Sequence, residues 1–202
     1  MLRSSSRVIL TDRIKISYMV LPIYLYGSEV LRETAAPADL SDKERITRLV
    51  ADMEETLAKA EGCGLAAPQV GESVRILIVD GTGMADVYPY LENFKRVMIN
   101  PVVIEESSKK ATYSEGCLSI PGVYCDVVRP ESITVEYYDG NFEKVTETFD
   151  KFACRMVQHE MSHLDGDLFV DHVAPIRKKI ITKKLASISK GKVFARYNTK
   201  IK

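Results

Sequence analysis

The chain has no tryptophan, only three histidines and only four cysteines among its 202 residues. It also lacks an uninterrupted apolar run long enough to span a bilayer, so the sequence predicts no transmembrane helix. Four cysteines without a secretory signal imply no disulfide framework and indicate a reducing compartment. These absences exclude a membrane-spanning protein and a small secreted domain held together by disulfides.

The composition is that of an ordinary globular chain. Hydrophobic residues make up 46% of it and charged residues 28%, and the formal net charge is zero. At this length such a chain can bury a core, and it fits one domain better than two. We find no internal repeat.

Two of the three histidines lie in one short motif, the H-E-x-x-H pattern of residues 159–163. On a helix, His159 and His163 are at i and i+4, so both imidazoles leave the same face one turn apart. That spacing lets them bind one metal ion, while Glu160 lies close enough to act as a base for water bound to the metal. The motif predicts a metal-assisted hydrolase.

A catalytic metal of this kind takes three protein ligands and keeps one position for water, so a third ligand is needed. The extended pattern H-E-x-x-H-x-x-G-x-x-H fails because its last position is Phe169, and no glutamate follows Glu160. The downstream candidates all lie close behind the motif: Asp165, Asp167, Asp171 and His172.

An upstream candidate is Cys117, in the segment E-G-C-L-S-I-P-G of residues 115–122. Its neighbour Gly116 has no side chain, so the backbone can crowd against a metal or a substrate. A thiolate with two imidazoles is an acceptable ligand set for zinc or ferrous iron. We therefore favour Cys117 over the downstream groups and interpret the other three cysteines as small buried hydrophobes.

A third segment, G-C-G-L-A-A-P-Q at residues 62–69, completes a pattern. With G-x-G-x-A-A-x-Q, E-G-C-L-S and Q-H-E-x-x-H in this order, the chain resembles the peptide deformylase family over about residues 20 to 190. It departs at Ser162, where the family usually has aspartate. Because that position is neither ligand nor base, the change leaves the chemistry intact but could remove a polar contact behind the ligands.

The resemblance implies removal of the formyl group from formylmethionine at the N-terminus of new polypeptides. Metal-bound water attacks the formyl carbon, and Glu160 takes the proton of that water and delivers it to the departing amine. The side-chain amide of Gln69 and the backbone N–H of Leu118 hold the oxyanion. Ferrous iron is the implied metal, although zinc, nickel and cobalt also suit Cys117 and the two histidines.

For the substrate pocket we select four residues. Gly64 would let its main chain approach the peptide, and Met156, one turn before His159, would line the pocket for the substrate methionine. Glu115 would line the pocket or cap a loop, and Gly116 lies beside the ligand Cys117. Ordinary core packing is the alternative for Met156.

Two other functions remain open on the sequence alone. A metallopeptidase of another type would cleave unformylated peptides. A non-catalytic zinc-stapled binding module would have four protein ligands and no exchangeable water, and the presence of Glu160 and Gln69 argues against it.

Both ends of the chain are basic. Residues 1–18 form an N-terminal extension that we expect to be disordered; a transit peptide is the alternative, and we place the enzyme in the cytoplasm. Residues 19–190 form the catalytic domain, and residues 191–202 a basic tail. From His172 onward there are ten lysines or arginines and no acid, which indicates either a solvated face or a footprint for ribosomal RNA, with no membrane or DNA partner.

Helices and strands are predicted from spacing. A capping-box signature at residues 41–44 opens a helix that Gly62 ends. Strands are expected at 75–80, 96–105, 122–129, 133–138 and 142–149. The metal motif lies on a helix over about 150–164 that is apolar on several sides and therefore buried.

A last helix begins near Pro175, a residue suited to a first helical turn. Its predicted inner side consists of Ile176, Ile180, Ile181, Leu185 and Ile188. Residues 196–202 are expected to fray. Strands followed by a buried helix indicate an α+β fold: antiparallel sheets around the central motif helix, with a C-terminal helix.

Overall fold

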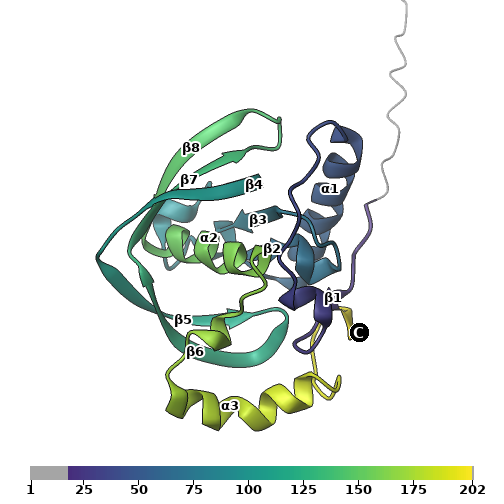
Figure 1. Ribbon diagram of the computed structural model, residues 1–202, viewed down its shortest axis with the longest axis vertical. Coiled ribbons are helices and arrows are strands. Elements are labelled where there is room, and N and C mark those ends of the chain that lie inside the picture. The colour runs from purple at the N-terminus through teal and green to yellow at the C-terminus, as the bar shows by residue number, and fades with distance from the viewer. Residues whose placement is uncertain (1–17, 202) are drawn as a thin grey trace, which may run out of the picture.

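The computed structural model describes residues 18–201 and comprises three helices and nine strands (Figure 1). The helices are α1 (Lys43–Ala60), α2 (Lys151–Leu164) and α3 (Pro175–Ile188). The strands are β1 (Ile23–Tyr24), β2 (Gly64–Ala66), β3 (Ile76–Asp80), β4 (Lys95–Glu106), β5 (Lys110–Cys117), β6 (Ile120–Pro130), β7 (Ser132–Tyr138), β8 (Lys144–Asp150) and β9 (Thr199–Lys200). The N-terminal extension predicted at residues 1–18 lies, except for Tyr18, outside the described residues.

One five-stranded sheet forms the larger layer, with strand order β2-β3-β4-β7-β8 and antiparallel pairing throughout. Burial alternates along β7, so that Ile133, Val135 and Tyr137 face the core while their neighbours face outward. Strands β5 and β6 form a separate antiparallel hairpin. Strand β5 was not predicted, because its sequence K-A-T-Y-S-E-G-C is mostly polar. Most of its side chains are exposed or only partly buried, so the strand has no clear alternating pattern of apolar residues.

Helix α2 lies between the five-stranded sheet and the β5–β6 hairpin (Figure 1). Its apolar residues share one core cluster with side chains of the sheet, such as Leu77 and Val135. Eleven of its fourteen residues are buried, including both histidines and Glu160 of the motif. The predicted α+β fold, with antiparallel sheets around a buried motif helix, is confirmed.

The chain turns sharply at both ends of α2. Strand β8 leads directly into the helix, and Lys151 adopts a left-handed φ of 52° at the junction. After the helix, Gly166 has a φ of 73°, and a Cβ there would lie 2.6 Å from the carbonyl oxygen of Arg32. Glycine is therefore required at position 166 both by the backbone conformation and by the close approach of a second chain segment.

Helix α1 begins one residue later than the capping-box signature implied. Its N-cap is Asp42, whose Oδ1 accepts a hydrogen bond from the backbone N–H of Arg45 at 3.2 Å. Ser41 instead donates its hydroxyl to Asp39 at 2.7 Å. Either residue can cap a helix, and the extra bond to Asp39 decides which one does.

The C-terminal residues expected to fray are ordered against the start of the domain. Strand β9 pairs in parallel with β1, and flanking bonds join Ile23 N to Asn198 O and Leu25 N to Lys200 O, each at 2.9 Å. A contact between residues so far apart in sequence leaves no periodic signal in a short polar segment, so local patterns did not predict it.

Helix α3 packs through a narrower stripe than predicted. Ile181, Leu185 and Ile188 are buried, but Ile176 and Ile180 are 70% and 65% exposed, so their assignment to the inner side was wrong. The helix rests mainly on β6, and one strand covers only one side of it. Within residues 18–201 no helix is long and apolar enough to cross a bilayer.

This packing predicts opposite results for two substitutions on one helix. Leu185→Ala should lower the free energy of unfolding by about 2–5 kcal/mol, because it leaves a cavity in the cluster beneath α3. Ile180→Ala should change it by less than about 0.5 kcal/mol, since the side chain is exposed. Urea denaturation of both variants measures the difference. Equal losses in the free energy of unfolding would contradict the packing of α3 through its Leu185 side.

Candidate metal centre

Cys117, His159 and His163 come together although they lie on different elements. Cys117 ends β5, and the two histidines are one turn apart on α2. The candidate ligand atoms of all three lie within 4.8 Å of one another, and the Cys117 sulfur is 3.2 Å from Nε2 of His163. This is the one group of the described residues with potential metal-ligand atoms so close together.

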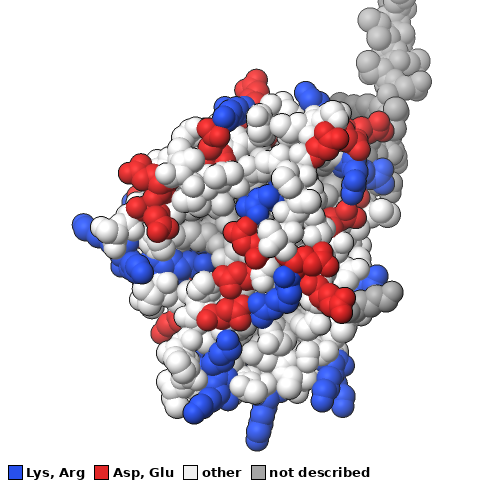
Figure 2. Space-filling model, in the orientation of Figure 1, with Lys and Arg blue, Asp and Glu red and all other residues white. Residues whose placement is uncertain are grey.

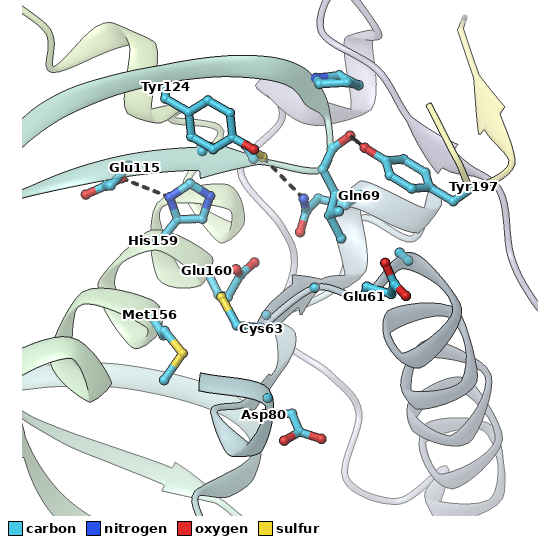
Figure 3. Close-up of a pocket in the computed structure, with 18 of the residues that line it drawn as sticks. Glu61, Cys63, Gln69, Asp80, Glu115, Tyr124, Met156, His159, Glu160 and Tyr197 are labelled. Atoms are coloured by element: carbon cyan, nitrogen blue, oxygen red, sulfur yellow. Dashed lines mark hydrogen bonds and ion pairs between the residues drawn. The ribbon is translucent and has the colours of Figure 1, made fainter. Parts of the chain in front are cut away.

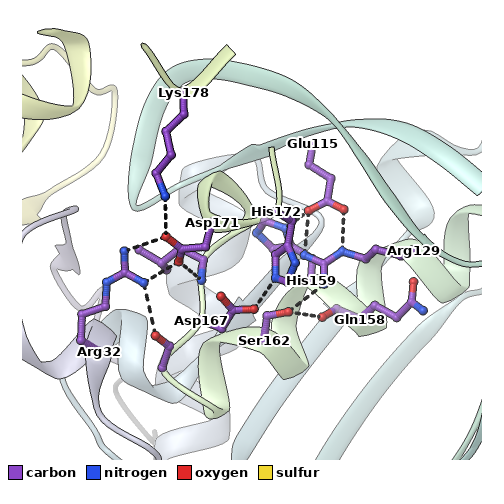
Figure 4. Close-up of polar contacts among 12 residues, drawn as sticks. Arg32, Glu115, Arg129, Gln158, His159, Ser162, Asp167, Asp171, His172 and Lys178 are labelled. Carbon is purple, nitrogen blue, oxygen red and sulfur yellow. Dashed lines mark hydrogen bonds and ion pairs between the residues drawn. The ribbon is translucent and has the colours of Figure 1, made fainter. Parts of the chain in front are cut away.

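The downstream alternatives to Cys117 form ion pairs with other residues, and Figure 4 shows those of Asp167, Asp171 and His172. Asp171 binds Arg32 at 2.5 Å, and Asp165 binds Arg75 at 2.7 Å. Asp167 pairs with His172. The structure therefore places Cys117, and none of these downstream residues, with the two motif histidines.

His159 is oriented by a buried carboxylate. Its Nδ1 lies 2.9 Å from Oε2 of Glu115, a contact visible in Figures 3 and 4. Metal-binding histidines commonly donate their second nitrogen to such a partner, which fixes the ring and leaves the other nitrogen for the ion. Burial alone would raise the pKa of Glu115, but the hydrogen bonds from His159 and Arg129 hold that pKa well below its usual range.

Two arginines complete the surroundings of Glu115. Arg129 donates to both carboxylate oxygens at 2.8 and 3.1 Å, and Arg155 donates to Oε1 at 2.6 Å. Glu115 borders the pocket, but its oxygens are directed at these three partners. Arg155 was not singled out from the sequence; the available signal was a charged residue between the apolar Cys154 and Met156 of the predicted buried helix.

Ser162 keeps a polar contact behind the ligands. Its hydroxyl accepts a hydrogen bond from Arg129 at 2.9 Å and donates one to the carbonyl of Gln158 at 3.0 Å. The polar contact that serine at this position could have removed is thus present, with Arg129 as its partner.

Glu160 is buried beside the three candidate ligands. Burial is the main cause that raises its pKa, to about 7, and its Oε2 has no hydrogen-bond partner among residues 18–201. A Cβ at Gly64 would lie 2.8 Å from the Glu160 carboxyl carbon. Glycine at position 64 therefore makes room for the Glu160 side chain, and it would also allow a peptide to approach the main chain.

Gln69 is held with its amide nitrogen toward Cys117. Its Oε1 accepts the backbone N–H of Ala66 at 2.8 Å, which fixes which end of the amide faces the cysteine. Its Nε2 lies 3.5 Å from the Cys117 sulfur and 3.3 Å from the Ser119 hydroxyl. A hydrogen-bond donor is thus fixed at the edge of the candidate metal site.

Gln69, Cys117, His159 and Glu160 line an open pocket of about 960 Å³ (Figure 3). Met156, Gly64 and Gly116, the residues selected for the substrate, also line it. The space left by Gly116 is filled by the Tyr124 ring, whose Cδ1 would lie 2.7 Å from a Cβ there. Residues 194–197 of the C-terminal segment line the pocket too, and no pattern in the sequence indicated this.

The residues present fit a divalent transition metal. Burial is the main cause that lowers the pKa of His163 well below its usual value, and this direction favours the neutral imidazole that a metal ligand needs. A thiolate and two imidazoles form the three-ligand arrangement of a catalytic site with one position for water. The buried carboxylate of Glu160 beside them argues against a closed structural site.

Comparison with known proteins agrees with this geometry. The polypeptide deformylase family model matches residues 20–179. The chain belongs to this family. A peptide deformylase of Christiangramia forsetii is 44% identical over 186 residues, covering 89% of this chain and 94% of the relative. One of Chlorobium phaeobacteroides is 44% identical over 179 residues, with 89% and 94% covered.

Solved structures give the same result. The crystal structure of a peptide deformylase from Legionella pneumophila superimposes with a TM-score of 0.75 at 33% identity, covering 85% of this chain and 96% of that one. The chain is thus a deformylase, a hydrolase that acts on N-formylmethionyl peptides in protein biosynthesis.

The position of Glu115 in this deformylase predicts an effect on metal affinity. Glu115→Gln should weaken metal binding roughly 10–100-fold, because the variant loses the anionic partner that orients His159. Glu147→Gln is the matched control: this carboxylate, on β8, also binds an arginine and a second side chain, Arg96 on β4 and Tyr137 on β7. Metal titration of the apo proteins measures both. Equal affinity in the Glu115 variant and the wild type would contradict the assigned role.

Proposed function

We propose that this deformylase removes the formyl group with a divalent metal held by Cys117, His159 and His163 and with Glu160 as general acid and base. The observation that carries the proposal is the buried, unpartnered oxygen of Glu160 beside a cluster of three ligand atoms at the base of the pocket. When bound, the ion supplies Lewis acidity and lowers the pKa of water.

The protein groups then have separate tasks. Glu160, with a pKa raised by burial to about 7, accepts the proton of the attacking water and returns it to the departing amine. The Gln69 amide, fixed by Ala66, and the backbone N–H of Leu118 donate hydrogen bonds to the oxyanion. Met156, a flexible thioether on the pocket wall, contacts the substrate methionine, next to the main chain of Gly64 and Gly116.

We propose ferrous iron as the native ion, because a soft thiolate with two imidazoles suits it; zinc, nickel and cobalt fit the same ligands. We also propose one catalytic domain over residues 19–190 in a cytoplasmic enzyme. The basic segment 191–202 follows that domain in sequence, and part of it borders the pocket.

Two variants separate binding of the metal from chemistry. Glu160→Gln should retain metal but lose roughly 10²–10⁴-fold in kcat, the usual contribution of a general acid–base group. Cys117→Ala should lose tight metal binding, whereas Cys125→Ala, which removes a buried thiol elsewhere in the hairpin, should not. Metal analysis of protein purified without oxygen, alongside a formylmethionyl-peptide assay, tests both. A Glu160 variant with full metal and full turnover would sink the proposal.

A further proposal concerns the ribosome. At the lower end of the molecule, where α3 lies, Figure 2 shows basic side chains spaced along an otherwise uncharged surface, and residues 172–202 contain no acid. Lys184 donates to the carbonyl of Gly122, and Lys178 is 3.7 Å from Asp171. Lys179 and Lys183 are exposed on the same helix, and we propose that they contact ribosomal RNA where nascent chains emerge.

Charge reversal tests this contact. Lys179→Glu with Lys183→Glu should reduce co-sedimentation with ribosomes and lower the slope of log affinity against log salt by roughly two, while activity on short formyl peptides stays unchanged. Lys109→Glu with Lys110→Glu is the control, since this exposed pair lies at the other end of the β5–β6 hairpin. If the wild type and both charge-reversed variants bind ribosomes equally at low salt, the α3 lysines only keep the protein in solution.

A further inference from the structure

Leu118 and Ser119 form the two-residue turn between β5 and β6, directly after the ligand Cys117. Under the proposed function, this turn presents the Leu118 N–H to the oxyanion. Its orientation is therefore a requirement of the reaction, and a hairpin turn that borders an open pocket needs support from outside the hairpin.

Two contacts hold Ser119 from the N-terminal part of the chain. The backbone N–H of Tyr26, which follows β1, donates to the Ser119 carbonyl at 2.8 Å. The amide of Gln69 donates to the Ser119 hydroxyl at 3.3 Å. Both of these donors come from residues ahead of the hairpin.

The preceding carbonyl is held from the C-terminal end. The hydroxyl of Tyr197 donates to the Leu118 carbonyl at 2.7 Å, from the rim of the pocket (Figure 3). Successive carbonyls of the turn are thus bound from opposite ends of the sequence. The two bonds fix the peptide groups Leu118–Ser119 and Ser119–Ile120, which directly follow the peptide group that carries the Leu118 N–H.

Tyr197 is itself held in place. It lies just before β9, whose pairing with β1 includes the bond from Ile23 N to Asn198 O at 2.9 Å. Its ring packs against the core cluster that contains Ile23 and Leu57, and Leu118 packs against the same cluster. Burial raises the pKa of Tyr197 above the ordinary value of a tyrosine, so its hydroxyl keeps the proton that it donates.

We infer that Tyr197 is a positioning residue of the deformylation reaction, which acts through the Leu118 carbonyl to fix the turn that holds the oxyanion. The inference rests on the proposed function of the Leu118 N–H. It assigns a role in the reaction to the C-terminal segment, beyond the metal ligands and the general base. The substrate need not touch the hydroxyl, because the effect passes through the turn.

The test is Tyr197→Phe, which removes one hydroxyl and keeps the ring. Because the lost bond acts on a group used in the transition state, kcat should fall roughly three- to tenfold, the size expected for one neutral hydrogen bond. KM and metal content should stay within about twofold of wild type, since the substrate and the ligands are not touched.

Tyr137→Phe is the matched control. Its hydroxyl also donates one hydrogen bond, to Glu147 at 2.8 Å, but it lies on β7 away from the pocket. This variant should show wild-type kcat per bound metal. Thermal unfolding of both variants separates a loss of stability from a loss of turnover.

A second measurement uses Gln69→Ala, alone and combined with Tyr197→Phe. Because both residues hold the same turn, their effects on kcat should not be additive, whereas independent sites add. Wild-type kcat in Tyr197→Phe, or a loss that matches the loss of bound metal or folded protein, would overturn the inference. If the wild-type protein itself fails to deformylate peptides, the proposed function falls instead, so the two failures are distinct.

Discussion

The buried carboxylate of Glu115 joins the two elements on which the candidate metal site depends. It is on the hairpin strand β5, and its partners Arg155 and His159 are on α2. The side chains of Glu115 and Arg155 are only 3% and 4% exposed, so removing Glu115 would leave the buried guanidinium charge uncompensated, at a cost of about 3–5 kcal/mol. Arg155 also binds the carbonyls of Val127 and Ala111 on the hairpin. Folding and ligand geometry therefore depend on the same cluster.

The charge of this cluster does not balance. One carboxylate faces two guanidinium groups, and Arg129 extends to the neutral hydroxyl of Ser162. The excess positive charge favours the anionic forms of the groups around it, and Arg129 acts in this direction on Glu160 against the larger effect of burial. Side chains outside the ligand set thus influence the electrostatics of the site.

Local patterns in the sequence predicted the buried motif helix and most strands, because i, i+4 spacing and alternating burial are properties of short segments. They also selected three candidate ligands that the structure brings together. They failed where a contact between residues far apart in the sequence determines which side chains are buried. Ile176 and Ile180 have the same periodicity as Ile181, yet only the residue that meets β6 is buried. Arg155 resembles a surface charge until β5 and β6 close over it, and Tyr197 resembles part of a polar tail until β9 meets β1.

The pairing of β1 with β9 also has a consequence for biosynthesis. Residues 23–24 are among the first of the described chain to be made, and residues 199–200 are among the last, so this contact closes nearly the whole chain into a loop. Such a closure has a large entropic cost and follows the formation of local structure. The five-stranded sheet, α2 and the β5–β6 hairpin can assemble while synthesis continues. The bond from Tyr197 to the Leu118 carbonyl cannot form until the C-terminal segment has been made. An enzyme that acts on unfinished proteins would thus complete its own pocket only after residues 199–200 have been made.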